Sequence, residues 1–408
     1  MGTVGRLLAV VSLLVLGVTG RAGAGEGPAP WAGSWEAAPS GTDPAVPGAA
    51  FRNVLHLSVG GDVIRVRVSN RLGSAPLRLG AVTVALRRGA GPDAVPGSMR
   101  AATFAGAGTA VVPVGQDLVS DPVPLTVPAA ADLLVTVETP GDSGPATYHR
   151  VALQTSYLAE QGAGRAADED GGAYTRTTGH WYYVTGVDVE AAARGSVVAF
   201  GDSLTDGNGT SMDANHRWPD RLAARLRPFR VGVLNAGISG NRLLLDSTGG
   251  PAALRRLDAD ALDRSGVRTL VVLEGINDIK GTPEATDPAD FVRAYRTLVT
   301  RAHHRGIRVI GATLTPYAGY SGYTDAREAV RQAVNALIRT RHVFDAYVDF
   351  DAVVRDPQRP GRIRPAYDPG DHLHFNDAGT RALADAVPLA DLLRPVSRPR
   401  SPRSASRP

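Results

Sequence analysis

The chain has 408 residues, of which 43% are hydrophobic and 21% are charged, and it contains no cysteine. This size and composition are those of a globular protein of two domains, and they exclude disulfide, thiolate and cysteine-linked lipid chemistry. The formal net charge of +4 comes from the ends of the chain, because residues 394–408 hold five arginines and no acidic residue. The body of the chain is therefore not predicted to bind nucleic acid.

Both ends of the chain have compositions of their own. Residues 1–24 are typical of a secretory signal peptide, with a positive start at Arg6, an apolar stretch over Leu7–Val18 and an A-x-A cleavage site at Ala22–Ala24. The apolar stretch is too short to span a membrane comfortably, and no other candidate span is found. Residues 394–408 are mostly Pro, Ser and Arg, which predicts a disordered basic tail. We therefore expect a secreted protein.

Residues 31–189 are predicted to form an all-β domain. Hydrophobic residues alternate along 64–68, 82–86 and 133–137, which is the period of a strand with one buried face. The region is rich in glycine and proline, and it contains no convincing amphipathic helix. These features favour an all-β sandwich or jelly-roll-like domain, with residues 161–172 as a mobile loop.

Residues 195–393 follow a different pattern, in which short apolar strands alternate with amphipathic helices. The expected strands are Val197–Phe200, Val231–Leu234, Thr269–Leu273, Val309–Leu314 and Tyr347–Phe350. Between the first two strands, Trp218, Leu222 and Leu226 recur at the spacing of one helix face. This order predicts a mostly parallel sheet covered on both faces, which is a flavodoxin-like three-layer α/β/α domain.

The connection between these two regions is short. Only residues 190–195 separate the end of the β-rich region, which includes Trp181–Val184 and Val187–Val189, from the first strand of the α/β domain. A flexible tether is normally longer and richer in Gly, Ser or Pro. We therefore expect a packed interface between the domains, with these aromatic residues close to it.

Polar segments that contain glycine follow the expected strands of the α/β domain. Residues 201–203 (GDS) follow the first strand, 239–241 (SGN) the second and 275–278 (GIND) the third, and 371–374 (DHLH) lie near the end of the domain. Ligands bind beyond the carboxyl ends of the strands in sheets of this kind. We therefore expect the four segments to converge at one edge of the sheet.

The residue types in these segments fit nucleophilic acyl transfer. The hydroxyl of Ser203 becomes a nucleophile once a base takes its proton, and His374 can be that base while Asp371 holds its other ring nitrogen. The backbone N–H groups of Ser203 and Gly240 and the side-chain amide of Asn277 can stabilise an oxyanion. Each segment alone is explained equally well as a turn or a helix cap, and their order favours catalysis.

Together the four segments resemble the sequence blocks of the SGNH hydrolase superfamily, also called GDSL esterases and lipases, over about residues 196–393. The resemblance implies the following set: Ser203 as the nucleophile, His374 as the base, Asp371 as its partner, and an oxyanion hole at Ser203, Gly240 and Asn277. It also implies ester hydrolysis without a metal or another cofactor. The preceding β-rich region is similar to the N-terminal domain of secreted bacterial members.

Several neighbouring polar residues have plainer interpretations. Asp202 and Asp206 are expected to serve as turn and capping residues. His372 is expected to point away from Asp371, because it follows that residue directly. Two histidines, at 372 and 374, do not make a metal site, so none is predicted.

Three tyrosines, Tyr317, Tyr320 and Tyr323, lie in a glycine-rich segment after the fourth strand. They are candidates for lining the substrate pocket. An equally good interpretation is that they pack together and anchor a loop.

The sequence thus predicts a secreted serine esterase that acts through an acyl-enzyme on Ser203. The expected substrate is a small-molecule or polysaccharide ester, namely an acetylated carbohydrate or a short-chain acyl ester. A lipase- or phospholipase-type acylhydrolase is the alternative within the same class. A carbohydrate-binding protein on an inactive hydrolase fold is the alternative from another class. The sequence does not indicate an oligomeric state.

Overall fold

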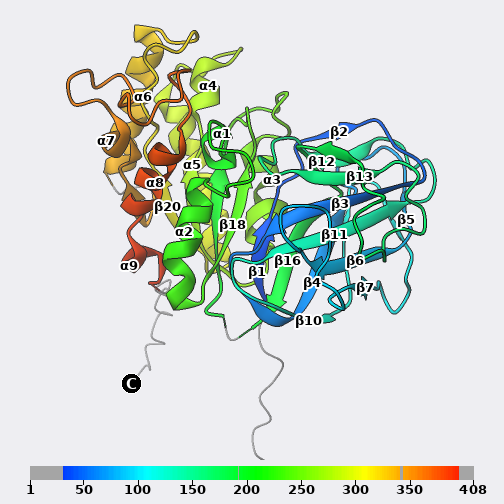
Figure 1. The fold of residues 1–408 in the computed structure, drawn as a ribbon. Coiled ribbons are helices and arrows are strands. Elements are labelled where there is room, and N and C mark those ends of the chain that lie inside the picture. Colours follow the sequence, from blue (N-terminus) through cyan, green and yellow to red (C-terminus); the bar gives the residue numbers. More distant parts are fainter. Residues whose placement is uncertain (1–30, 192, 341–342, 395–408) are drawn as a thin grey trace, which may run out of the picture.

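The computed structural model describes residues 31–394 except 192, 341 and 342 (Figure 1). The predicted signal peptide at 1–24 and the predicted tail beyond Arg394 lie outside the described residues. Within the described part, no helix combines the length and the apolar character that crossing a lipid bilayer requires.

The N-terminal part of the structure consists mostly of antiparallel sheets (Figure 1). One sheet has the order β1 (Trp31–Glu36), β16 (Val184–Glu190), β4 (Gly61–Ser69) and β10 (Val123–Val127), and β9 (Asp117–Val119) also pairs with β4. The second has the order β14 (Arg176–Thr178), β13 (Ser156–Ala159), β3 (Ala49–His56), β11 (Asp132–Thr139), β6 (Val82–Leu86) and β7 (Arg100–Ala102). Two small sheets complete this part: β15 (Trp181–Tyr182), β12 (Ala146–His149) and β2 (Gly41–Asp43) in one, and β5 (Leu77–Leu79) and β8 (Ala110–Val112) in the other.

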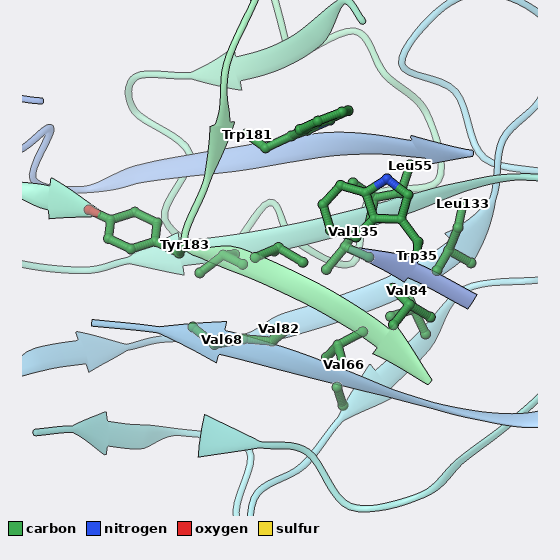
Figure 2. Packing of buried hydrophobic residues seen from close by; sticks show 14 of the residues in the cluster. Trp35, Leu55, Val66, Val68, Val82, Val84, Leu133, Val135, Trp181 and Tyr183 are labelled. Atoms are coloured by element: carbon green, nitrogen blue, oxygen red, sulfur yellow. The ribbon is translucent and has the colours of Figure 1, made fainter. Parts of the chain in front are cut away.

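The two larger sheets share one hydrophobic core. Val66 and Val68 of β4 are fully buried in the same cluster as Leu55 of β3 and Val135 of β11 (Figure 2). The intervening residues of β4 are more exposed, as a strand with a period of two requires. The all-β prediction for this region is therefore confirmed.

The loop over residues 161–172 is more firmly held than its composition suggests. Ala166 is fully buried, and its N–H donates to Glu138 Oε1 at 2.9 Å. The guanidinium of Arg52, also fully buried, donates to the carbonyl oxygen of Asp168 at 2.7 Å. These contacts pack the loop onto the second sheet, although its glycine and charge content alone indicated a mobile segment.

The C-terminal part contains one parallel sheet. Its order is β18 (Gly232–Gly237), β17 (Ser196–Gly201), β19 (Val267–Leu273), β20 (Arg308–Ala312) and β21 (Ala346–Val348). This is the 2-1-3-4-5 order of flavodoxin-like folds. Val197 and Ala199 of β17 pack into one core cluster, whereas Val198 and Phe200 pack into another on the opposite face.

Helices cover both faces of this sheet, which confirms the predicted three-layer α/β/α arrangement (Figure 1). One face carries α2 (Trp218–Leu226), α7 (Phe350–Val354), α8 (Asp377–Ala386) and α9 (Leu389–Leu392). The other carries α3 (Ala253–Leu257), α5 (Pro288–His304) and α6 (Asp325–Arg339). The short elements are α1 (Ser203–Asp206), α4 (Ile276–Lys280), the 3-10 helix η1 (Arg227–Phe229) and the π-helical turn η2 (Asp258–Leu262).

The N-terminal β-strands pack directly against the parallel sheet. Ser58 Oγ accepts a hydrogen bond from the N–H of Val233 in β18 at 2.9 Å. Glu36 at the end of β1 forms an ion pair with Arg264 at 2.7 Å, and both side chains are almost completely buried. Burial raises the pKa of Glu36 to about 8, although the charge of Arg264 opposes this shift. The interface is thus packed, as the short connection predicted.

Replacing Arg264 with Ala should strongly destabilise the protein, because the carboxyl groups of Glu36 and Asp260 would lose a buried cationic partner. We expect the free energy of unfolding to fall by about 3–5 kcal/mol, the usual cost of breaking a buried pair. The exposed pair Arg176–Glu160 provides the control, since Arg176→Ala should cost less than about 1 kcal/mol. Urea unfolding measures both changes, and equal effects would contradict the expectation.

Candidate active site

Ser203 occupies the first position of α1, two residues after β17 ends at Gly201. Asp202 caps this helix, because its Oδ1 accepts the N–H of Leu204 at 2.9 Å. A Cβ atom on Gly201 would lie only 2.4 Å from the carbonyl oxygen of Leu273, so this tight turn requires glycine. The turn places Ser203 at the carboxyl end of the parallel sheet, and the capping role expected of Asp202 is confirmed.

Ser203, His374 and Asp371 form a continuous chain of contacts. His374 Nε2 lies 2.9 Å from Ser203 Oγ, and His374 Nδ1 lies 2.5 Å from Asp371 Oδ2. Asp371 Oδ1 also accepts the N–H groups of Leu373 and His374, at 3.0 and 2.9 Å. Burial opposes ionisation of Asp371, but the hydrogen bonds from the ring and the N–H of His374 outweigh it and lower the pKa of Asp371. The carboxylate therefore stays ionised beside the imidazole.

The other predicted segments lie beside Ser203. Gly240 adopts a φ of +80°, a left-handed conformation that favours glycine. No described group accepts a hydrogen bond from the backbone N–H of Ser203 or Gly240. Asn277 in α4 donates from Nδ2 to the carbonyl oxygen of Asn241 at 2.8 Å and to Asp202 Oδ2 at a longer 3.3 Å. The amide of Asn277 thus joins the segments that follow β17, β18 and β19.

Asp202 is fully buried behind the nucleophile. Burial raises its pKa to about 7, although the N–H of Leu204 and the charge of Lys280 oppose this shift. Its side chain caps α1 and also contacts Asn277.

Arg256 in α3 supports these segments, and sequence reasoning missed it. Its guanidinium donates to the carbonyl oxygens of Gly201 and Ala236 at 2.9 and 2.7 Å and to Asn241 Oδ1 at 2.8 Å. The side chain is buried over the ring of Phe200, with 4.2 Å from its Cζ to the ring centroid. Arg256 thus binds the ends of β17 and β18 together, but an arginine in a short helix gives no sequence signal for this role.

Asp206 differs from its expected capping role. It lies at the last position of α1 and is buried. Its Oδ1 lies 3.0 Å from Nε2 of His149 in the N-terminal part, and its Oδ2 accepts the N–H of Ser239 at 2.8 Å. Because both carboxylate oxygens are used in tertiary contacts, the prediction of a capping role for Asp206 is wrong.

His372 pairs with Asp368, and its expected orientation away from Asp371 stays a prediction. Its Nδ1 lies 2.5 Å from Oδ2 of Asp368, which the sequence did not single out. His372 also has a φ of +63°, which is unusual for a residue other than glycine. Among the described residues, no three His, Asp or Glu side chains are arranged to hold a metal ion.

The three candidate tyrosines pack on one another. The ring centroid of Tyr317 lies 5.3 Å from that of Tyr323 and 6.5 Å from that of Tyr320. Tyr317 is fully buried, and burial raises its pKa to about 12. Tyr320 and Tyr323 are half-buried against the same core cluster. The structure thus gives Tyr317 a packing role, and substrate binding by Tyr320 and Tyr323 stays a prediction.

The parallel sheet, its helices and the four segments at its carboxyl edge define an SGNH-type α/β domain. Residues 199–382 match the sequence model of the GDSL-like Lipase/Acylhydrolase family. Residues 199–382 thus form a GDSL-like Lipase/Acylhydrolase domain, which confirms the resemblance seen in the sequence and supports an ester-hydrolysing enzyme.

Several solved structures are similar to part of the chain. A lipolytic protein of the G-D-S-L family from Desulfitobacterium hafniense DCB-2 is 20% identical, with a TM-score of 0.38 over 49% of this chain and 99% of that chain. An aryl esterase from M. smegmatis is 20% identical, with a TM-score of 0.39 over 47% and 95%. A carbohydrate acetylesterase from Sinorhizobium meliloti is 17% identical, with a TM-score of 0.39 over 47% and 95%. No curated protein matches this sequence.

The two histidines should differ sharply when each is replaced with Ala. His374→Ala removes the ring that contacts Ser203 and should lower kcat at least ~10³-fold. His372→Ala removes a ring that pairs with Asp368 instead and should lower kcat less than about fivefold. Steady-state kinetics on an activated ester compare them, and a larger loss in His372→Ala would identify His372 instead of His374 as the base.

Proposed function

We propose that the protein is a serine esterase that hydrolyses carboxylic esters through an acyl-enzyme on Ser203. The observation that carries this proposal is the chain of contacts from Ser203 Oγ through His374 to Asp371, with distances of 2.9 and 2.5 Å. The match of residues 199–382 to an acylhydrolase family supports the reaction class.

In the proposed reaction, His374 Nε2 accepts the proton of Ser203 Oγ as this oxygen attacks the ester carbonyl. The carboxylate of Asp371 accepts the hydrogen bond from Nδ1–H and stabilises the imidazolium. The lowered pKa of Asp371 keeps this carboxylate ionised. The C–O bond to the alcohol then breaks, and Nε2–H gives its proton to the leaving oxygen. Water attacks the acyl-enzyme with the same base and releases the acid and free Ser203.

Three donors are available for the negative charge that develops on the carbonyl oxygen. The backbone N–H groups of Ser203 and Gly240 have no acceptor among the described residues. An oxyanion also competes well for the Asn277 amide, because the 3.3 Å contact with Asp202 Oδ2 is long for a hydrogen bond. Fixed donors of this kind stabilise the transition state without reorganising.

For the substrate, we propose a small-molecule or polysaccharide ester, either an acetylated carbohydrate or a short-chain acyl ester, hydrolysed outside the cell. The signal-peptide pattern of residues 1–24 and the additional N-terminal β-domain support an extracellular role. A panel of acetylated xylan, other acetylated sugars and p-nitrophenyl esters of increasing acyl length tests the proposal. Highest kcat/KM on long acyl chains would instead favour a lipase-type enzyme.

Ser203→Ala should abolish turnover and leave the fold unchanged, because only the nucleophile is removed. The wild type should release p-nitrophenol from an activated ester in a burst equal to the enzyme concentration when deacylation is slow. The variant should show neither a burst nor turnover, with at least a ~10³-fold loss of kcat. A wild type without esterase activity would favour an inactive binding protein, and an active variant would overturn the proposed mechanism.

Asn277→Ala should lower kcat by roughly 10²–10³-fold with little change in KM, as expected for the loss of one oxyanion donor. Circular dichroism controls for folding, because Asn277 also bonds to Asn241. A change in KM alone would make Asn277 a substrate-binding residue rather than an oxyanion donor.

A further inference from the structure

His149 is a buried histidine of the N-terminal part that reaches into the α/β domain. It is the last residue of β12 and only 3% exposed. Its Nδ1 lies 2.8 Å from the carbonyl oxygen of Ala38. Its Nε2 lies 3.0 Å from Asp206 Oδ1 and 3.1 Å from the carbonyl oxygen of Val151.

These contacts determine the protonation of the ring. All three partners are oxygen acceptors, so each ring nitrogen of His149 must carry a hydrogen to bond with them. Burial opposes the charge, but the carboxylate of Asp206 outweighs it and raises the pKa of His149. The structure therefore holds a buried imidazolium–carboxylate pair between the two parts of the chain.

Asp206 contacts His149 with one carboxylate oxygen and, with the other, the segment that carries the predicted oxyanion hole. Its Oδ2 lies 2.8 Å from the N–H and 2.6 Å from the Oγ of Ser239. Ser239 directly precedes Gly240, and Asp206 lies on the same short helix as Ser203. One carboxylate therefore connects the helix that carries the nucleophile to the turn that carries the Gly240 N–H.

We propose that His149 is a positioning residue for catalysis, which fixes the Ser239–Gly240 turn relative to Ser203 through Asp206. This inference rests on the proposed esterase function. A carboxylate buried without a cationic partner would take up a proton or rotate towards water. Without His149, Asp206 would then no longer hold Ser239 in place, and the Gly240 N–H would lose its alignment with the oxyanion.

Trp181 and Arg217 lie close to His149. Its ring lies 5.4 Å from the ring of Trp181, and the guanidinium of Arg217 lies on Trp181 at 5.3 Å. Arg217 in turn forms an ion pair with Asp220 and donates to the carbonyl oxygen of Ala152. A buried contact held by hydrogen bonds and ion pairs can set the position of a donor to within a fraction of an ångström.

Replacing His149 in the full chain tests the inference. His149→Ala should lower kcat on p-nitrophenyl acetate by about 10–100-fold, which is the effect of a small misplacement of catalytic groups. KM should change less than about threefold, because the loss affects the transition state. His149→Gln keeps one N–H donor for Asp206 and should recover part of the lost kcat.

The inference can also be tested without His149→Ala, by replacing Ser239 in the α/β domain, so the test does not depend on whether His149→Ala folds. Ser239→Ala removes the hydroxyl that contacts Asp206 and should also lower kcat at nearly constant KM. Because both residues act through Asp206, the double variant should lose little more activity than the more impaired single variant. Multiplying losses would mean that the two residues act separately and would overturn the inference.

Arg65 provides the matched control for loosening of the domain interface. This residue of β4 pairs with Asp188 at 2.9 Å and donates to Ser265 Oγ across the interface at 2.9 Å, without touching the predicted site. Arg65→Gln should lower the melting temperature and leave kcat unchanged at temperatures where the protein is folded.

The outcomes separate the inference from the proposed function. Unchanged kcat in folded His149→Ala, alongside inactive Ser203→Ala, would overturn the inference and leave the esterase function intact. An equal loss of kcat in Arg65→Gln would also overturn it, because a general loosening would then explain the effect. Full activity in Ser203→Ala would overturn both.

Discussion

Three neighbouring strands of the parallel sheet, β18, β17 and β19, end at the same level, because Gly201 of β17 pairs with both Gly237 of β18 and Leu273 of β19. The polar segments after these strands consequently leave the sheet side by side. Arg256 strengthens this arrangement by bonding to the carbonyl oxygens of Gly201 and Ala236. A shift of one strand by a single residue would separate Ser203 from its predicted oxyanion donors, so the whole site depends on this register.

The N-terminal β-strands contribute to the same arrangement from outside the sheet. Ser58 accepts a hydrogen bond from the backbone of β18, and Glu36 pairs with Arg264 beside the π-helical turn. His149 contacts the element closest to the nucleophile, because its partner Asp206 lies on the same short helix as Ser203. The N-terminal strands therefore pack against the elements that carry the predicted site, and the two regions form one packed unit.

Local patterns in the sequence were sufficient to predict the fold class of each region and the main segments of the site. Alternating apolar residues gave the β-sheets, and short strands followed by glycine-bearing turns located Ser203 and Asn277 near one sheet edge. Pairings between distant residues were not predictable in this way. Nothing near His149 indicates Asp206 as its partner, since the contact depends on how two domains pack. The burial of Arg256 and Ala166 likewise follows from tertiary packing, which composition and periodicity do not encode.

The most direct measurement of acyl-enzyme chemistry on Ser203 is intact-mass spectrometry after reaction with a p-nitrophenyl phosphonate. The serine oxygen would attack phosphorus and release p-nitrophenolate, which leaves a stable adduct that resembles the tetrahedral intermediate. We expect one adduct per chain, located by peptide mapping at Ser203, and slow labelling when His374 is replaced with Ala. No adduct, or an adduct on another serine, would contradict Ser203 as the nucleophile.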